Sequence, residues 1–241
     1  MKLLILESSG LVASVAVMEE EKMIGEYTVN YKKTHSQTLL PMVDELVKNI
    51  GLDLHELDAI GVSKGPGSFT GLRIGSATAK GLSQALQIPV VPVSTLEGLA
   101  ANLFGTEGVI CPMMDARRSQ VYTGVYRYEG SKLVTVMEPA ALPVEELIEY
   151  LNKNGEPVIF LGDGVPVYED KLSEKMTLSY RIAPSHLNRQ RAGAVGTLAL
   201  QYFKEGKIEA SKDHKPEYLR KSQAERELLA RQKETSKNCQ S

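Results

Sequence analysis

The residues best suited to do chemistry lie in one glycine-rich segment, residues 64–75, with the sequence KGPGSFTGLRIG. Glycine and proline close together favour a tight turn. The hydroxyls of Ser68 and Thr70 are suited to cap a helix that begins there. Because backbone N–H groups at a helix N-terminus bind anions, Gly67 and Ser68 are candidate phosphate-binding residues.

This segment does not match the two common nucleotide-loop patterns. In a Walker A loop the lysine follows the last glycine, whereas Lys64 precedes all of them. The glycines at 65, 67 and 71 are spaced one residue too widely for the dinucleotide-binding pattern. Two interpretations stay open: a strand-to-helix turn kept tight by packing, and a site for an anion.

Two further polar turns carry candidate residues. Ser8 and Ser9, between the first two expected strands, are candidates to line a phosphate pocket, and Glu7 beside them is a candidate to hold a metal-bound water. A plain hairpin turn is the alternative.

Asp115, Arg117 and Arg118 form a charged group at a later hairpin. Arginine binds carboxylates and phosphates through paired hydrogen bonds, so these three residues are candidates for polar contacts with a ligand or a partner. The alternative is a local ion pair.

The sequence shows no pattern typical of a metal or nucleophile site. None of the four histidines, His35, His55, His186 and His214, is paired with another at i,i+4 spacing. Each is expected at the surface or at a helix cap. The Gly-x-Ser-x-Gly motif is missing as well. We therefore expect no catalytic residue, no metal ion and no bound cofactor.

Hydrophobic patterning predicts the elements that position these residues. Three antiparallel strands come first, helices and strands then alternate, and a similar series begins near residue 109. Pro41 is expected in the first turn of its helix, which would start near Thr38. The expected strands are residues 2–7, 11–18, 22–30, 58–63, 90–93, 109–115, 120–128, 133–139 and 157–161, and the expected helices are residues 37–50, 70–86, 95–103, 143–151, 165–172 and 192–204.

This order predicts an α/β fold of two ribonuclease-H-like lobes in tandem, as in ATPases of the actin and Hsp70 type, with mixed sheets flanked by helices. The expected domains are residues 1–105, which carry the partner-binding helices, and residues 106–225, which include a helix packed between the lobes. Residues 226–241 are expected to be a disordered tail.

A helical surface for a partner is the other candidate site. Gly71, Gly75 and Ala79 recur every four residues, which would leave a smooth strip that another helix can approach closely. Packing against the chain's own sheet is the alternative. The residues expected to bind a partner are Leu39, Val43, Leu46, Val47, Gly71, Ile74, Gly75, Thr78, Ala79 and Leu82.

Composition narrows the protein class. Of the 241 residues, 42% are hydrophobic and 24% charged, as in ordinary globular proteins, and the net charge of −2 gives no overall attraction to nucleic acid or membrane. Cys111 and Cys239 do not suggest a disulfide framework. Because neither a signal peptide nor a membrane-spanning run is recognised, we expect a cytoplasmic protein.

Several motifs, in order along the chain, resemble the TsaB (YeaZ) family. The resemblance runs over about residues 1–225 and its combined motifs are specific. They are HSQ at 35–37 with Leu40 and Pro41, GPGSFTGLRIG at 65–75, PVSTLE at 92–97, DARR at 115–118 with Val121 and Tyr122, and YLR at 218–220.

The resemblance implies two ribonuclease-H-like lobes and a role in the bacterial synthesis of threonylcarbamoyladenosine, the modified adenosine beside the anticodon of tRNA. It implies a non-catalytic subunit that binds its paralogue, the transferase TsaD, through two helices of the first lobe. The ATPase TsaE joins this complex. It also implies a homodimer through the same helices when the chain is alone, and tRNA contact only through the complex.

The resemblance further implies an inactive paralogue. TsaD has a metal-binding His-x-x-x-His pair where this chain has Thr95 and Leu99, and neither side chain replaces an imidazole ligand. Many relatives have Asp-Thr-Ser where this chain has Glu7, Ser8 and Ser9, which argues against Mg-nucleotide binding there. The peptidase label attached to the superfamily has no support in the sequence. The alternative function is a nucleotide-dependent ATPase or transferase with its own site between the lobes.

Overall fold

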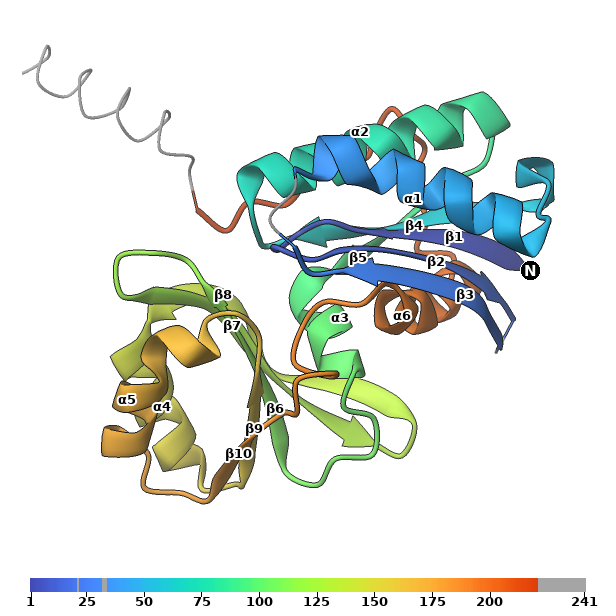
Figure 1. Cartoon of the computed structure of the whole chain (residues 1–241). Coiled ribbons are helices and arrows are strands. Elements are labelled where there is room, and N and C mark those ends of the chain that lie inside the picture. The colour runs from blue at the N-terminus through green and yellow to red at the C-terminus, as the bar shows by residue number, and fades with distance from the viewer. Residues whose placement is uncertain (21, 32–33, 221–241) are drawn as a thin grey trace, which may run out of the picture.

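The structure is a computed structural model of the chain and describes residues 1–20, 22–31 and 34–220. Two five-stranded mixed sheets follow one another along the sequence, and helices pack on both faces of each sheet (Figure 1). Four hydrophobic clusters fill the layers between the sheets and their helices. The expected tail, residues 226–241, lies outside the described residues.

The first sheet has the strand order β3-β2-β1-β4-β5. β1 (Lys2–Glu7), β2 (Ala13–Glu19) and β3 (Lys22–Val29) form an antiparallel meander, and β4 (Ala59–Gly65) and β5 (Val90–Ser94) extend it parallel to β1. All residues of β1 after the first are buried. Its continuous apolar sequence fits a central strand that is covered on both faces.

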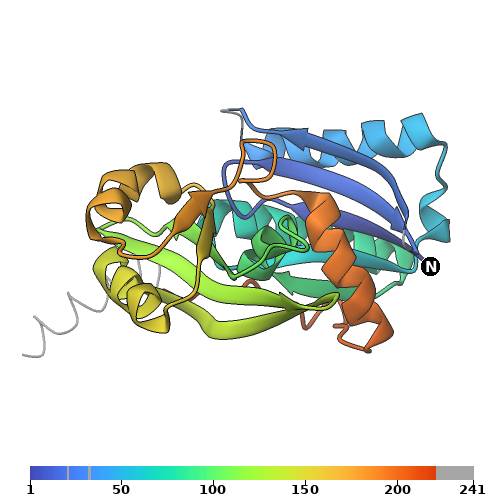
Figure 2. The ribbon, with the colours of Figure 1, turned by 90° about the horizontal axis from the view of Figure 1, so that it is seen from below.

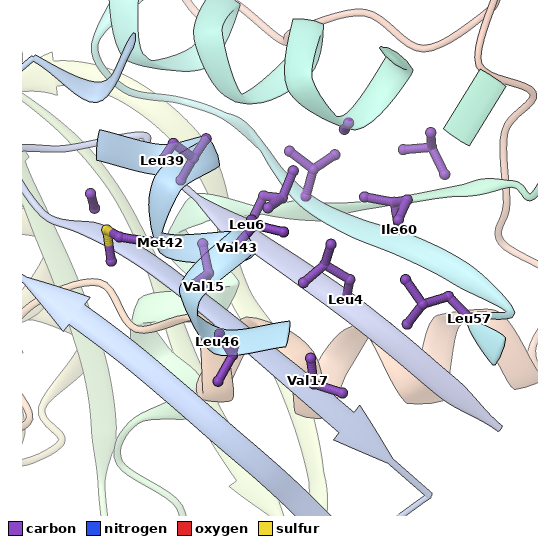
Figure 3. Close-up of a cluster of buried hydrophobic side chains, with 14 residues drawn as sticks. Leu4, Leu6, Val15, Val17, Leu39, Met42, Val43, Leu46, Leu57 and Ile60 are labelled. Carbon is purple, nitrogen blue, oxygen red and sulfur yellow. The ribbon is translucent and has the colours of Figure 1, made fainter. Parts of the chain in front are cut away.

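α1 (His35–Ile50) and α2 (Phe69–Leu86) lie side by side on one face of this sheet (Figure 1). The apolar face of α1 packs onto β1 and β2, where Leu39, Val43 and Leu46 are drawn above the sheet (Figure 3). A short 3₁₀ helix, η1 (Leu54–Glu56), follows α1.

The start of α1 corrects one expectation. Pro41 was expected in the first turn, but the helix already begins at His35, so Pro41 lies in the second turn. The additional residues are held in place because the His35 Nε2 hydrogen-bonds the carbonyl oxygen of Gly10, 2.8 Å away.

The second sheet repeats this arrangement, with the order β10-β9-β6-β7-β8. Aligning β6–β10 with β1–β5 gives the same neighbours and directions, which confirms the expected tandem ribonuclease-H-like fold. α4 and α5 cover one face of the sheet. The elements are β6 (Val109–Asp115), β7 (Gln120–Glu129), β8 (Lys132–Pro143), α4 (Val144–Asn154), β9 (Val158–Leu161), α5 (Val165–Lys175) and β10 (Tyr180–Ile182).

Two helices join the halves of the molecule (Figure 2). α6 (Ala192–Lys204), the helix expected between the lobes, covers the face of the first sheet opposite α1 and α2. α3 (Thr95–Ala101) follows the first sheet in sequence but packs on the second. The two helices touch closely, since a Cβ added at Gly98 would lie 2.8 Å from Val195. Each sheet therefore receives a helix from the other half of the chain.

Candidate functional site

The glycine-rich segment between β4 and α2 packs against the β1–β2 turn. A Cβ added at Gly67 would overlap the Ser9 carbonyl oxygen, and one added at Gly71 would overlap the Ser8 carbonyl oxygen. At Gly75 it would overlap the Ser8 hydroxyl. The three glycines therefore let α2 approach the chain's own hairpin, and this contact accounts for their four-residue spacing.

Several groups expected to hold an anion are used inside the protein. The Ser68 N–H donates to the Ser9 carbonyl oxygen (2.7 Å), and the Ser8 hydroxyl donates to the Gly71 carbonyl oxygen (2.9 Å). The Ser68 hydroxyl caps α2 by accepting the Gly71 N–H at 3.3 Å. Among the anion candidates, Ser9, Gly67 and Ser68 line a cleft, whereas Ser8 points into α2.

Glu7 lies behind the hairpin and is 0% exposed. Its carboxylate accepts hydrogen bonds from the Ser9 N–H (2.6 Å), the Ser9 hydroxyl (2.5 Å) and the Ser63 hydroxyl. Burial raises the pKa of Glu7 above its usual value, while these hydrogen bonds act in the opposite direction. Glu7 is enclosed and is not among the residues that line the cleft, so the contacts described here give no support to its candidate role of holding a metal-bound water, which stays a prediction.

The cleft has a volume of about 610 Å³ and lies between the two sheets. The β1–β2 turn and the N-terminus of α2 form one wall, and the ends of β6 and β9 form the other. Asp115, Arg117 and Arg118 all line it. The structure thus brings the charged candidates and three anion candidates to one place, although they come from opposite halves of the chain.

The β6–β7 turn has an uncommon backbone. Arg117, Arg118 and Ser119 have φ values of 64°, 56° and 55°, a left-handed conformation that costs about 1–2 kcal/mol per non-glycine residue. Asp115 supports the turn, because its carboxylate accepts the Arg117 N–H (2.8 Å) and pairs with the Arg117 guanidinium (3.4 Å). For Arg117 the local ion pair is therefore present. Arg118 has no ion pair within the described part of the chain.

Two cleft residues were missed by the sequence reasoning. Asp163 follows β9 between two glycines, and its Oδ1 has no hydrogen-bond partner among the described residues; burial raises its pKa. The Nδ1 of His35 is likewise without a partner in this part of the chain. The position of Asp163 at the end of a strand was an available signal. His35 was discounted for want of a second histidine.

His214 also differs from the expectation. It was expected at the surface or at a cap, but it is 1% exposed. Its Nδ1 lies 2.9 Å from the Glu209 carboxylate. The reason is tertiary, since the segment after α6 folds back onto β5 through paired backbone hydrogen bonds between Val90 and Glu209.

The positions of the missing histidine pair lie in α3. Thr95 and Leu99 are both fully buried, in or beside the cluster that joins α3 to the second sheet. Among the residues that the structure describes, no group of three or more His, Cys, Asp or Glu side chains is arranged to hold a metal ion.

The α1–α2 surface differs from the one expected. Leu39, Val43, Leu46 and Ala79 belong to the buried cluster between the two helices and the sheet, and Gly71 and Gly75 face the β1–β2 turn, so these six are not available at the surface. The smooth strip packs on the chain's own sheet, which was the alternative. Four expected partner residues, Val47, Ile74, Thr78 and Leu82, are only half-buried.

A different set of small residues faces outward on α2. Ala77, Gly81 and Ala85 recur at the same four-residue spacing and are exposed. Space around Gly81 is open, because a Cβ added there would meet nothing within 4 Å. On α1, Leu40 is 53% exposed. The sequence indicated a helix-packing surface through small residues repeated every four positions. α2 contains two such strips, the buried one of Gly71, Gly75 and Ala79 and the exposed one of Ala77, Gly81 and Ala85, and only burial distinguishes them.

The segment after α6 crosses α2 and reaches the cleft, a contact that the sequence did not reveal. The Glu217 N–H donates to the Lys64 carbonyl oxygen (2.6 Å), and Tyr218 stacks on Phe69 with ring centroids 4.6 Å apart. Arg220 then donates to the Ala116 carbonyl oxygen at 2.5 Å. This strap, residues 207–220, therefore connects the first sheet to the β6–β7 turn of the second.

No helix in the described ranges is both long and apolar enough to span a lipid bilayer.

Comparison with known proteins gives consistent matches over nearly the whole chain. The family model for TsaD, tRNA N6-adenosine threonylcarbamoyltransferase, matches residues 22–228. The Bacillus subtilis (strain 168) tRNA threonylcarbamoyladenosine biosynthesis protein TsaB is 34% identical over 97% of this chain and 100% of its own length. The Escherichia coli (strain K12) protein of the same name is 30% identical over 95% of this chain and 98% of its own length.

Solved structures agree with these matches. YeaZ from Pseudomonas aeruginosa superposes with a TM-score of 0.76 at 29% identity, over 90% of this chain and 100% of that protein. Shared sequence along almost the full length, together with the same tandem fold, identifies the family that the motifs indicated. The chain belongs to the TsaB (YeaZ) family.

Proposed function

We propose that this protein acts in tRNA threonylcarbamoyladenosine biosynthesis as a non-catalytic subunit that binds and activates a TsaD-type transferase. TsaE joins the same complex, tRNA is contacted only through it, and the chain forms a homodimer when alone. The complex acts in the cytoplasm. The single observation that carries the non-catalytic role is that the chain's own β1–β2 turn packs against the glycine-rich segment and accepts the Ser68 N–H.

This contact bears directly on whether the segment can bind phosphate. A phosphate on this loop would need free backbone N–H groups, but Ser68 N and Gly71 N are already bound within the protein. The acid of the hairpin, Glu7, is enclosed by three donors from Ser9 and Ser63. Residues 95 and 99 supply no imidazole ligand. These features support a subunit that keeps the fold without a working phosphate site.

The outer face of α1 and α2 is the proposed docking surface. Leu40 and the half-buried Val47, Ile74 and Leu82 provide apolar area between the two helices. The exposed small residues Ala77, Gly81 and Ala85 let a partner helix approach closely, because interaxial distance depends on side-chain size. This surface replaces the buried strip as the assignment of the partner site.

Gly81→Arg tests the surface without disturbing the core. The new side chain starts in open space and removes a helical glycine, so the fold should be kept. We expect the variant to lose copurification with TsaD from the same organism. Ser173→Arg, which adds the same charge at an exposed position of α5, is the matched control and should copurify normally. Full recovery of the complex with Gly81→Arg would rule out this surface.

The pathway is tested separately. Depletion of the chain in its host should lower threonylcarbamoyladenosine in total tRNA, measured by mass spectrometry of the nucleosides. Unchanged content would contradict the proposed function even if the complex forms. Adding back the Gly81→Arg variant should fail to restore the modified nucleoside, whereas adding back Ser173→Arg should restore it.

A second candidate function is a nucleotide-dependent ATPase or transferase with its own site between the lobes. The observation in its favour is the 610 Å³ cleft, where Arg118 is exposed and Asp163 has an unpartnered oxygen among the described residues. Calorimetric titration of the isolated chain with Mg-ATP separates the two candidates. Tight binding, lost in Arg118→Ala, would favour the enzyme. A titration that shows no binding of Mg-ATP would favour the non-catalytic subunit.

A further inference from the structure

A second pocket lies where β4, β5, α3, β8, α6 and the strap meet, and it shares no lining residue with the cleft. Its volume is about 430 Å³, within the range of pockets that bind small molecules. Gly65, Pro66, Pro92 and Pro139 form part of its wall. Because these residues come from both halves of the chain, the pocket exists only in the complete fold.

Glu97 is the central charged group of this pocket. Its carboxylate accepts a hydrogen bond from the Tyr202 hydroxyl at 2.9 Å and another from the Ser94 N–H. It has no ion pair among the described residues, and burial raises its pKa. Glu97 is partly buried, and a carboxylate removed from water without a cation gains from the arrival of a positively charged partner.

Both signs of charge line the pocket. Lys64 pairs with Glu217 at 2.9 Å across the wall. Lys207 lies over the Tyr202 ring, with its Nζ 4.6 Å from the ring centroid, and pairs with Glu205 at 2.7 Å. A second acid, Glu138, also lines the pocket. The two lysines both act on Glu97 electrostatically. A simple cation bound at Glu97 would be repelled by these ammonium groups. A molecule with a positive and a negative group could pair with the Glu97 carboxylate and with the lysines at the same time.

One further hydroxyl, that of Ser94, is consistent with the same polar ligand. Ser94 lines the pocket at 8% exposure; its Oγ is enclosed beside the Tyr126 hydroxyl, and neither atom makes a hydrogen bond of good geometry within the described ranges. Although Ser94 precedes α3, its side chain does not cap that helix. An ammonium group has three N–H donors, so one bound to Glu97 has others left for a neighbouring hydroxyl oxygen.

We propose that this pocket binds a small zwitterion of the α-amino-acid type. The ammonium group lies on Glu97 and Ser94, and the carboxylate faces Lys64 and Lys207. The inference does not rest on the proposed function, because it concerns the isolated chain. It also predicts coupling to the strap, since Lys207 and Glu217 of the strap line the pocket and Glu217 pairs with Lys64 of β4.

Calorimetric titration of the purified full chain with each of the twenty L-amino acids tests the proposal. We expect saturable one-to-one binding by at least one of them. Ethanolamine, which lacks the carboxylate, and propionate, which lacks the ammonium group, should each bind at least about tenfold more weakly, a difference of about 1.4 kcal/mol. Equal binding by ethanolamine would contradict the zwitterion.

Matched variants locate the site. Glu97→Gln keeps an acceptor for the Tyr202 hydroxyl and should reduce affinity at least tenfold, with an unchanged unfolding temperature as the check on folding. Ser94→Ala, which removes no helix cap, should weaken binding several-fold. Glu149→Gln, an exposed position on α4, is the control and should bind as the unmodified chain. Absence of binding by all amino acids up to about 10 mM, or binding unaffected by Glu97→Gln, would overturn the proposal.

Discussion

Gly71→Ala and Gly81→Ala make a matched pair in one helix. Both remove a glycine from α2, Gly71 in its first turn and Gly81 in its interior, and both add a single methyl group. At Gly71 the added Cβ would overlap the backbone carbonyl oxygen of Ser8, which cannot rotate away as a side chain would. At Gly81 it would meet nothing within 4 Å. The pair therefore separates helix propensity from the contact with the hairpin.

The expected sizes follow from two opposing effects. Replacing a helical glycine by alanine stabilises a helix by about 1 kcal/mol. Forcing an extra carbon into a close-packed contact costs about 1–3 kcal/mol, and a rigid backbone neighbour places Gly71→Ala near the upper end. We therefore expect Gly71→Ala to destabilise the protein by about 2 kcal/mol and Gly81→Ala to stabilise it by about 1 kcal/mol. In a chain of this size these changes correspond to about 4–8 °C down and 2–4 °C up in Tm.

Thermal unfolding followed by circular dichroism measures both variants. The sign of the difference is the decisive result. If Gly71→Ala unfolds at the same temperature as Gly81→Ala, the close contact between α2 and the hairpin does not exist, and the explanation of the glycine spacing fails. Gly75→Ala is a weaker test, because its neighbour is the Ser8 hydroxyl, which can rotate.

Three further results are expected. Burial raises the pKa of Glu7 above 4.5 in the folded protein, so the contribution of Glu7 to folding stability is full below pH 4.5 and is lost as the pH rises through the folded pKa. In urea unfolding, Glu7→Gln should therefore gain stability relative to the parent as the pH increases. A difference between the two proteins that does not depend on pH would contradict this. Tyr218→Ala removes the stacking on Phe69 and should cost about 0.5–1.5 kcal/mol and speed hydrogen exchange at the Glu217 amide, while the exposed Tyr31→Ala should change neither. Burial raises the pKa of Cys111 to about 12, so in a Cys239→Ser variant a disulfide reagent at pH 8 should label no thiol until urea is added; labelling of the native protein would be the contrary result.

Most elements could be predicted because their patterns are local. The buried run of β1 and the one-sided apolar spacing of α1 are visible in a few residues of sequence. β10 could not be found in this way, since only one of its three residues is partly buried, the other two are exposed, and they give no alternation. Pro41 misplaced the start of α1 because a tertiary contact, His35 to Gly10, adds a turn that propensity alone does not predict.

The candidate site was harder to predict, since its residues meet only in the fold. The motifs led to segments that the fold brings together, since Asp115, Arg117 and Arg118 share a cleft with Ser9 and Ser68. Which side of α2 faces the protein interior depends on tertiary packing. From spacing alone, the strip of Gly71, Gly75 and Ala79 fitted a partner-binding surface and packing within the chain equally well. The partner surface, the anion candidates and the domain boundary stay predictions.

The exchange of α3 and α6 between the halves has a consequence for synthesis on the ribosome. The first sheet is complete once β5 has been made, but one of its faces is covered mainly by α6, which comes near the end of the described chain. Until then Leu3, Ile5 and Val93 lack most of their cover. We expect the nascent chain to expose this apolar face during most of its translation and to complete its fold only after residue 204 has left the exit tunnel, even though N-terminal segments commonly fold first.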